Sequence, residues 1–490
     1  MSTAAGSGMQ DDLATPLVVD LDGTLILTDM LQETAVRRFR AEPLSVLRWP
    51  LWLARGRLAG FKERMIEGQP AIDPAALPYN RPLLDWLQEQ RQAGRRLVLC
   101  TASDQRLAHA IAEHLGLFHE VMASDGATNL KAEAKAAALV ARYGPRGFDY
   151  AGNHRADLPV WRDARRAIVV NAPAALERRA LKRFDVAAVF PRERAGARTW
   201  ARALRLHHWA KNVLLFVPLL AAHHFADGGG WLNAWLAFLA FGLCASSVYL
   251  ANDLLDLESD RRHPRKRRRP LAAGALTIPA ALAALPLLVA ASYLIAWQIN
   301  LEFVAGLTVY FALTCCYSLG LKRLILVDCL TLAILYTLRI IAGAVAAAVP
   351  ISFWALTFCG ALFLSLALLK RYAELLVHQA EGREQAHGRG YQIGDVPVLR
   401  SLGVASGYTA AVVLAQYLHS DTVRQLYRVP QLLALAVPIV VYWVSWLWLR
   451  ATRGQMHDDP LVFAFKDRAS LVAGLLFALV MVAGKVGWPW

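Results

Sequence analysis

From residue 212 to its end, the chain is a succession of apolar stretches separated by short polar loops. Several are close to the roughly 20 residues that an α-helix needs to cross a bilayer. Hydrophobic residues make up 56% of the chain and the mean hydropathy is +0.34, too apolar for an ordinary soluble protein. The sequence therefore predicts an all-α, polytopic membrane bundle of about nine transmembrane helices. The expected spans are 212–226 (the shortest), 231–250, 275–297, 303–319, 324–348, 352–370, 401–419, 430–450 and 469–487.

The loops between these spans differ in charge. Loops 251–274, 320–323, 371–400 and 451–468 are rich in Lys and Arg, whereas the others carry few cations or none. By the positive-inside rule, the basic loops and the N-terminus lie in the cytoplasm and the C-terminus lies outside the cell membrane. The first 16 residues lack the basic and apolar regions of a signal peptide, which agrees with a cytoplasmic first domain. The net charge of +15 is spread between apolar spans, which favours anionic headgroups or substrates as partners over nucleic acid.

The loop after the second span carries Asn252, Asp253, Asp256 and Asp260. A spacing of three or four places such side chains on one face of a helix. Clustered hard oxygen ligands suit Mg²⁺, which commonly bridges a protein to substrate phosphates, and the basic residues 261–269 that follow could hold a polyphosphate. A solvated helix end with a positive-inside anchor would explain the basic run, but not the polar stripe at the mouth of an apolar segment.

The first 190 residues have a different pattern. Apolar runs at 16–21, 96–100, 148–152 and 167–171 are separated by helical stretches, which is typical of a doubly wound α/β domain. Asp20 and Asp22 close the first run, Thr101 follows the second, and Asp157 comes shortly after the third. Ligands of open α/β sheets bind at the carboxyl ends of the strands. Residues 1–15 are expected to form a disordered lead.

The D-x-D-G-T run, the strand-end Thr, a Lys and G-N-x-x-x-D resemble the haloacid dehalogenase (HAD) phosphatase superfamily. The resemblance covers residues 16–190 and implies a Rossmann-like fold. It implies Asp20 as the nucleophile and Asp22 as the general acid and base, with Thr101 binding the phosphoryl group and Asp157 helping Asp20 and Asp22 to hold Mg²⁺. These roles suit the chemistry, because a carboxylate can attack phosphorus and a second carboxyl can protonate the leaving oxygen.

Two features of this region leave alternatives open. The family lysine is Lys131 or Lys135, and we prefer Lys135 because a helix follows it directly. Asn153 stands where many members carry an aspartate, so a degenerate domain kept for folding or docking is the alternative to an active phosphatase. Residues 28–90 are expected to form a small cap whose helical part is 31–65. Its Trp, Leu and Arg content suits either packing on its own domain or an interfacial helix.

The N-D-x-x-D-x-x-x-D motif within a membrane bundle resembles the UbiA prenyltransferase superfamily, over residues 198–490. Within it, the chain is similar to the branch that transfers 5-phosphoribose from phosphoribosyl diphosphate (PRPP) to decaprenyl phosphate. That similarity rests on residues 206–212, 260–267, 269–274, 317–322, 327–328, 338–343 and 370–375. A second aspartate-rich motif, usual in prenyl transferases, is replaced by Lys370, Arg371, Tyr372 and Glu374, which suits substrates that carry additional phosphates.

The resemblance implies a site for the transfer. Asp253 and Asp256 are the expected catalytic residues, and they hold Mg²⁺ with Asn252 and Asp260. The expected substrate-binding residues are Lys211, Arg267, Tyr317, Lys322, Arg339, Lys370, Arg371 and Glu374. Anchoring at the headgroups is the alternative for Lys370 and Arg371, and a place in the interfacial aromatic belt is the alternative for Tyr317.

Together the two resemblances predict a bifunctional enzyme. The expected domains are 16–190 (HAD-like), 191–211 (linker) and 212–490 (UbiA-like). PRPP and a polyprenyl phosphate would be joined by the membrane domain, and the HAD domain would then remove the 5-phosphate. A prenyltransferase that uses a polyprenyl diphosphate and a membrane-tethered phosphatase are the alternatives. The prenyl chain length, the final acceptor of the ribose and the oligomeric state do not follow from the sequence.

Overall fold

The computed structural model describes residues 13–55, 58–69, 72–125, 130–192, 195–380, 390–456 and 459–487. Most of the expected disordered lead therefore lies outside the described residues. The contacts divide the chain into two compact units. The first unit contains residues 1–204 and 250–283, and the second contains residues 205–249 and 284–490. The aspartate-rich stretch thus groups with the N-terminal region, although the sequence places it in the membrane domain.

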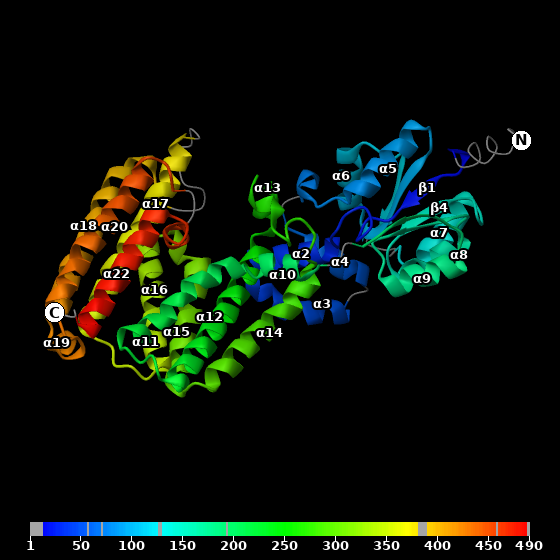
Figure 1. The fold of residues 1–490 in the computed structure, drawn as a ribbon. Helices are drawn as coiled ribbons and strands as arrows, with labels where there is room; N and C mark the ends of the chain where they lie inside the picture. Colours follow the sequence, from blue (N-terminus) through cyan, green and yellow to red (C-terminus); the bar gives the residue numbers. More distant parts are fainter. Residues whose placement is uncertain are drawn as a thin grey trace, which may run out of the picture. The chain divides into compact units, whose positions relative to one another are not determined.

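The first unit is built on a six-stranded parallel sheet with the strand order β3-β2-β1-β4-β5-β6 (Figure 1). The order reverses beside β1, which pairs with both β2 and β4, so the crevice at the carboxyl ends of β1 and β4 is the expected ligand site. The edge strands β3 and β6 were not predicted, and most of their residues are only partly buried. The strands are β1 (Leu17–Val19), β2 (Leu97–Asp104), β3 (Glu120–Ser124), β4 (Asp149–Gly152), β5 (Ala167–Val170) and β6 (Val186–Phe190).

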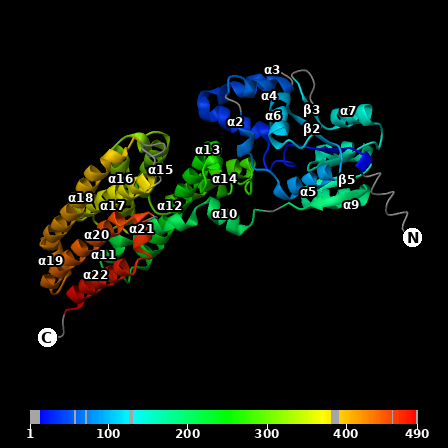
Figure 2. The same ribbon diagram turned by 90° about the horizontal axis from the view of Figure 1, so that it is seen from above.

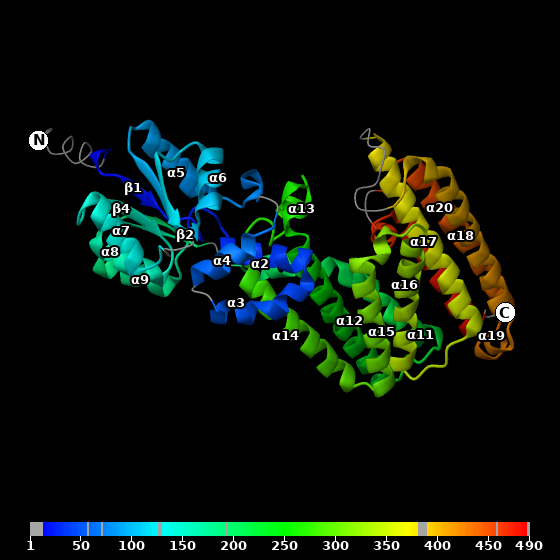
Figure 3. The ribbon, with the colours of Figure 1, turned by 180° about the vertical axis from the view of Figure 1, so that it is seen from behind.

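Helices cover both faces of this sheet, as Figure 3 shows. Helices α5 and α6 pack with Leu17 and Val19 on one face, while α7, α8 and α9 pack with Val18 on the other. Alternate residues of β1 thus reach two separate cores, as expected for a strand buried on both sides. These helices are α5 (Arg81–Gln92), α6 (Gln105–Leu115), α7 (Glu133–Tyr143), α8 (Leu158–Asp163) and α9 (Ala174–Arg183), and α10 (Ala197–Ala203) follows β6.

The predicted helical cap is confirmed. It contains α2 (Met30–Ala41), η1 (Pro43–Arg48), α3 (Trp49–Arg55) and α4 (Leu58–Ile66), with the short turn η2 (Pro74–Ala76) between the cap and α5. Asp29 caps α2 by accepting hydrogen bonds from the backbone N–H groups of residues 31 and 32. Leu44 and Leu47 are 79% and 76% exposed, an apolar surface that keeps the interfacial interpretation of the cap open.

The UbiA-like part of the chain is a helical bundle, as predicted. Among the described residues, eight helical segments are long and apolar enough to cross a membrane. They contain α12 (Gly228–Leu255), α14 (Ile278–Trp297), α15 (Leu301–Leu319), α16 (Val327–Ala346), α17 (Phe353–Ala380), α18 (Val396–Leu418), α20 (Ala436–Thr452) and α22 (Arg468–Val486). Shorter elements precede or connect them: η4 (Leu206–Phe216), α11 (Val217–Ala221), α13 (Leu257–Arg262), η5 (Lys266–Arg268), η6 (Leu321–Arg323), η7 (Ile393–Asp395), α19 (Asp421–Leu426), η8 (Pro430–Leu435) and α21 (Pro460–Ala464). The turn η3 (Arg155–Asp157) belongs to the α/β domain, between β4 and α8.

The first expected span, 212–226, does not form a long helix. Residues 212–216 lie in the 3₁₀ segment η4, residues 217–221 form the five-residue helix α11, and residues 222–226 belong to neither. Pro218 lacks the backbone N–H that an uninterrupted helix would use, and His223 has a left-handed φ of +58°, which ends the helical path. This stretch is therefore not among the eight candidate spans of the described residues.

Close helix packing joins the last part of the bundle, where α17, α18 and α20 lie side by side (Figure 2). A Cβ at Gly403 would lie 2.2 Å from the Trp448 ring, and one at Gly407 would lie 2.5 Å from Val444. Small residues let helix backbones approach closely, which is how helices commonly associate within membranes.

Candidate active sites

The first candidate site lies at the carboxyl end of β1, where Asp20 follows the strand. Nζ of Lys135, on α7, is 2.6 Å from Oδ1 of Asp20 and 3.2 Å from the carbonyl oxygen of Cys100. Both charged side chains are at least nine-tenths buried. Of the two lysines that the sequence left open, Lys135 is the one that contacts the expected nucleophile, whereas Lys131 lines the same cavity without a described contact to Asp20.

A hydrogen-bonded path continues from this lysine to Asp157. Lys135 donates to the hydroxyl of Tyr150 at 2.9 Å, and that hydroxyl donates to Oδ1 of Asp157 at 3.1 Å. Oδ2 of Asp157 accepts from the backbone N–H groups of Asn153 and His154 at 3.0 and 2.9 Å. The predicted residues Asp20, Lys135 and Asp157 are thus brought together. Tyr150 escaped prediction, because an aromatic residue in a buried strand ordinarily indicates core packing.

The side chain of Asp22 is held by three donors. Its Oδ1 accepts from the backbone N–H of Met30 at 2.8 Å, and its Oδ2 accepts from the hydroxyls of Ser103 at 2.6 Å and Thr101 at 3.3 Å. This arrangement joins the predicted pair Asp22 and Thr101. Ser103 was not predicted, although its place two residues after Thr101 on β2 was a usable signal.

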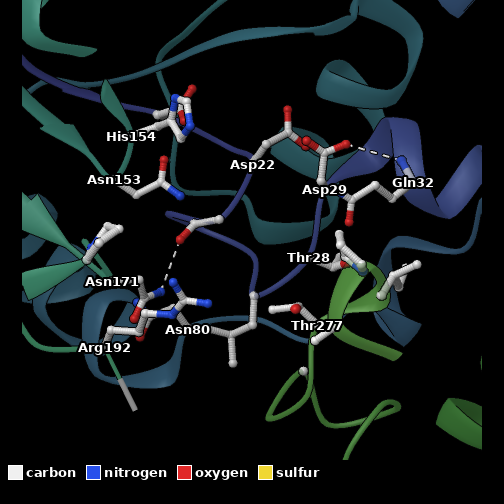
Figure 4. A pocket seen from close by; sticks show the side chains of 18 of the residues that line it. Asp22, Thr28, Asp29, Gln32, Asn80, Asn153, His154, Asn171, Arg192 and Thr277 are labelled. Carbon is white, nitrogen blue, oxygen red and sulfur yellow. Dashed lines mark hydrogen bonds between the residues drawn. The ribbon is translucent and has the colours of Figure 1, made fainter. Parts of the chain in front are cut away.

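The charge balance around Asp20 suits a cation. Burial, opposed by Lys135 and reinforced by the carboxylates of Asp157 and Asp22, raises the pKa of Asp20 to about 7. No three His, Cys, Asp or Glu side chains converge as a metal cluster within the described part of the chain. Mg²⁺ is usually held by one or two carboxylates together with waters and substrate phosphates, so Asp20 and Asp157, with Asn153 beside them, are a fitting set of donors. Figure 4 shows Asn153 and Asp22 facing the same cavity.

The aspartate-rich stretch spans the end of α12 and the short helix α13. The backbone N–H of Asp256 bonds to the carbonyl of Asn252, and that of Asp260 bonds to the carbonyl of Asp256, both at 2.8 Å. These hydrogen bonds continue the i, i+4 backbone pattern across the break at Asp256. The role of the four side chains as a metal site stays a prediction.

Arginines pair with the carboxylates of this stretch. Nη1 of Arg269 donates to both Asp253, at 3.1 Å, and Asp260, and Arg40 lies 3.8 Å from Asp256. Burial raises the pKa of Asp260, and Arg269 opposes that rise. A cation already bridges two buried carboxylates here, so the donors have the chemistry that Mg²⁺ requires. Arg267, in η5, is exposed.

The second unit contains a polar cluster around Asp459. Its Oδ2 accepts from Nζ of Lys211 at 2.7 Å and from Nζ of Lys370 at 3.0 Å, and the Tyr336 hydroxyl lies 3.3 Å away. Although burial works in the opposite direction, Lys370 and Lys211 hold the pKa of Asp459 well below its usual range. Two predicted substrate-binding lysines are therefore joined by a carboxylate that was not predicted.

A second cluster surrounds Arg371, which is almost fully buried. Its guanidinium donates to Asp328, to Glu374 at 2.6 Å and to the Tyr317 hydroxyl at 2.9 Å. Tyr391, which was not predicted, donates to Asp328 at 2.5 Å. The predicted residues Tyr317, Arg371 and Glu374 form one network.

Arg339, on α16, lies over the ring of Tyr336 and has further polar partners inside the bundle. It donates to Oδ1 of Asn212 at 3.0 Å and to the Tyr310 hydroxyl at 2.7 Å. Lys322, in η6, is half-buried. The substrate-binding roles of Arg339 and Lys322 stay predictions.

Comparisons with known proteins agree with this two-part organisation. A family model described as "UbiA prenyltransferase family" matches residues 214–466, more than half of the chain, and one described as "haloacid dehalogenase-like hydrolase" matches residues 17–162.

Three curated relatives indicate how far the similarity extends. The uncharacterized protein y4nM of Sinorhizobium fredii is 38% identical over 96% of this chain and 91% of its own. The nodulation protein NoeC of Azorhizobium caulinodans is 37% identical over 58% of this chain and 92% of its own. The decaprenyl-phosphate phosphoribosyltransferase of Mycolicibacterium smegmatis is 37% identical, over 37% of this chain and 58% of its own.

Proposed function

Because the chain belongs to the UbiA prenyltransferase family and also carries a HAD hydrolase domain, we propose that it performs two consecutive reactions on a lipid carrier. The first transfers 5-phosphoribose from PRPP to a polyprenyl phosphate. The second removes the 5-phosphate and gives polyprenyl-phosphoryl ribose. The similarity to an enzyme named decaprenyl-phosphate phosphoribosyltransferase is the observation that carries the proposal. That similarity covers part of each chain, so the identity of the substrates is tested by the experiment below.

The basic cluster of the second unit supports a substrate rich in phosphate. Lys211 and Lys370 lie on different elements and share the carboxylate of Asp459. A phosphate can take the place of that carboxylate, since both present anionic oxygens to ammonium groups. A prenyl diphosphate would need fewer cations than PRPP and a lipid phosphate together.

In the proposed transfer, an oxygen of the lipid phosphate attacks the anomeric carbon of PRPP. The new C–O bond replaces the bond to the diphosphate, which leaves with its electron pair. The attacking oxygen is already anionic, so no strong base is needed. Asn252, Asp253, Asp256 and Asp260 would hold Mg²⁺, which stabilises charge on the departing diphosphate. The phosphates would be held by Lys211, Arg267, Lys322, Lys370 and Arg371, and the predicted roles of Tyr317, Arg339 and Glu374 belong to the same proposal.

In the proposed hydrolysis, a carboxylate oxygen of Asp20 attacks the phosphorus of the 5-phosphate. Asp22 protonates the ribose oxygen as it leaves, and an aspartyl-phosphate remains. Water then attacks that phosphorus while Asp22 takes its proton, which releases phosphate and restores Asp20. Lys135 and Thr101 hold the phosphoryl oxygens. Asp20, Asp22 and Asp157 would hold Mg²⁺, which screens the negative charge of the phosphate from the carboxylates.

The proposal includes the orientation in the membrane. The eight candidate helices and the family make this an integral membrane protein. We place the HAD domain and the basic loops in the cytoplasm and the C-terminus outside, because the cations gather in alternate loops.

The test uses purified full-length protein with Mg²⁺, PRPP radiolabelled in the ribose and decaprenyl phosphate. The wild-type protein is expected to label the lipid without leaving a 5-phosphate. Asp20→Asn is expected to accumulate the phosphorylated lipid, and Asp253→Asn is expected to give no labelled lipid. Phosphorylated lipid from the wild type would contradict the second step. Absence of labelled lipid, with transfer from a polyprenyl diphosphate to another acceptor, would establish the prenyltransferase alternative instead.

A further inference from the structure

The cavity at the phosphatase site has walls from two distant parts of the sequence. Its volume is about 1020 Å³, and Asp20, Asp22 and Lys135 line it. A different wall consists of residues 271 and 273–280, which follow α13 and lead into α14. In Figure 4, Thr277 of this segment lies near Thr28 of the N-terminal domain, across the cavity from His154. We call residues 271–280 the wall segment; every residue that lines this cavity belongs to the first unit.

A buried ion pair ties the wall segment to the cap. Both terminal nitrogens of Arg261, on α13, donate to the carboxylate of Glu33, on α2, at 2.7 and 3.0 Å. The two side chains are only 6% and 9% exposed. Nε of Arg261 donates to the carbonyl of Ala272, and the hydroxyl of Thr28 donates to Glu33 at 2.5 Å. One guanidinium therefore fixes the cap helix and the wall segment at once, with the forked geometry that makes such pairs specific.

A close backbone approach adds a second constraint. Gly274 has a left-handed φ of +73°, and a Cβ there would lie 2.6 Å from Cβ of Leu27 and 3.3 Å from Cβ of Pro78. Only glycine permits both the conformation and the contact. The wall segment is thus seated directly against the loop that follows the catalytic aspartates.

The composition and connection of this wall indicate the class of substrate. Leu271, Leu276 and Ile278 make it largely apolar, whereas the catalytic residues across the cavity are charged. Ile278 is also the first residue of α14, one of the candidate membrane spans. Ligand pockets of about 300–1,000 Å³ enclose drug-sized molecules, so this cavity exceeds the needs of a bare sugar phosphate.

We propose that this cavity binds a phosphate monoester carried by a membrane lipid, and that the wall segment, held by Arg261 and Glu33, selects the lipid-linked substrate over small soluble esters. The inference rests on the proposed phosphatase function and names the substrate class of that site. Its consequence is that part of the UbiA-like sequence, within the matched range 214–466, determines the specificity of the HAD site.

The experiment compares two substrates on the full-length protein. One is synthetic polyprenyl-phosphoryl ribose 5-phosphate in detergent micelles, and the other is p-nitrophenyl phosphate. Gly274→Val displaces the wall segment, and Gly116→Val is its matched control, because Gly116 has a similar φ of +59° but no atom within 4 Å of a Cβ. A misplacement of about 1 Å can cost on the order of 100-fold in rate, so Gly274→Val should lower kcat/KM for the lipid substrate at least tenfold and change that for the small ester less than threefold.

The ion pair supplies an independent variant in case Gly274→Val fails to fold. Arg261→Glu should lower kcat/KM for the lipid substrate selectively, and the exchange Arg261→Glu with Glu33→Arg should restore most of it. Equal losses on both substrates, or no loss in either variant, would overturn the inference. A wild-type protein that cleaves the small ester but not the lipid-linked compound would overturn it while leaving a phosphatase. A wild-type protein that cleaves neither would refute the proposed phosphatase function itself.

Discussion

Lys211 and Lys370 share a single carboxylate oxygen of Asp459, at 2.7 and 3.0 Å from their ammonium nitrogens. Lys211 is on η4 and Lys370 is on α17, so the carboxylate joins two separate elements through one oxygen. Two ammonium groups brought this close repel each other unless an anion lies between them. Asp459 is therefore the internal counter-ion of both lysines.

Asp459→Asn should destabilise the ligand-free protein, because it leaves two ammonium groups without their counter-ion. Breaking a buried charge pair costs about 3–5 kcal/mol, measured here as a lower Tm in detergent. Added diphosphate should restore part of the loss by taking the place of the carboxylate. Glu42→Gln, which removes the exposed partner of Arg38, is the control and should cost less than about 1 kcal/mol. A variant with a wild-type Tm would contradict the counter-ion role.

The stability of the protein should fall on acidification because of His208. Burial, together with the nearby groups Lys211, His207, Arg205 and Lys370, lowers the pKa of His208 to about 3. In the unfolded chain a His titrates near 6.5, so between pH 6.5 and 3 the unfolded state binds the extra proton. Stability attributable to this group is thus complete above pH 6.5 and declines below it, by about 2 kcal/mol at pH 5.

The measurement is the free energy of unfolding in denaturant at pH 7 and pH 5, for the wild type and His208→Phe. The variant should lose about 2 kcal/mol less than the wild type across this interval. An identical loss in both proteins would show that His208 is not the group responsible.

Arg269→Gln should make the stability of the first unit depend on a divalent cation. Arg269 bridges Asp253 and Asp260, whose side chains are 4% and 1% exposed, and the substitution removes the cation that these two buried carboxylates share. We expect a lower Tm in EDTA and recovery on addition of Mg²⁺. Arg267→Gln removes an exposed arginine from the same loop and should show neither effect. A Tm that does not respond to Mg²⁺ would argue against a cation at this site.

The sequence predicted those features of the fold that depend on residues close together in the chain. The apolar run before Asp20 and Asp22 predicted the buried strand β1, and the spacing from Asn252 to Asp260 predicted helical backbone, which forms with i, i+4 hydrogen bonds over this stretch. These features depend on neighbours along the chain. They could be predicted because strand alternation and helical periodicity are local rules.

Contacts set by tertiary packing could not be predicted in this way. Asp459 lies 248 residues from Lys211 in the sequence. Because Pro460 follows it, the sequence alone indicates an ordinary N-terminal helix cap at Asp459. Tyr150 belongs to a buried strand, and only the packing of α7 brings Lys135 to it. The pairing of Arg261 with Glu33 crosses 228 residues. The stretch 212–226 shows the opposite failure, since its composition suited a span but Pro218 and the turn at His223 interrupt the helix.

Lys135→Met should abolish the phosphatase reaction, whereas Lys131→Met should not. Nζ of Lys135 lies 2.6 Å from Asp20 and reaches Tyr150 as well, so its loss removes the cation beside the nucleophile and leaves a buried carboxylate unpaired. Removal of one preorganised donor to a developing charge typically costs about 10²–10³ in kcat. Lys131 lines the cavity further along, so its loss should cost less than tenfold.

A thermodynamic cycle separates this catalytic effect from folding. Lys135→Met and Asp20→Asn should each lower the free energy of unfolding, and the double variant should lose less than the sum of the two, since each single change leaves one buried partner without the other. Contacting residues typically show coupling of about 0.5–3 kcal/mol. Additive losses would mean that the pair does not interact in solution. Equal losses of phosphatase activity in Lys131→Met and Lys135→Met would contradict the assignment of Lys135 as the catalytic lysine by its contact with Asp20.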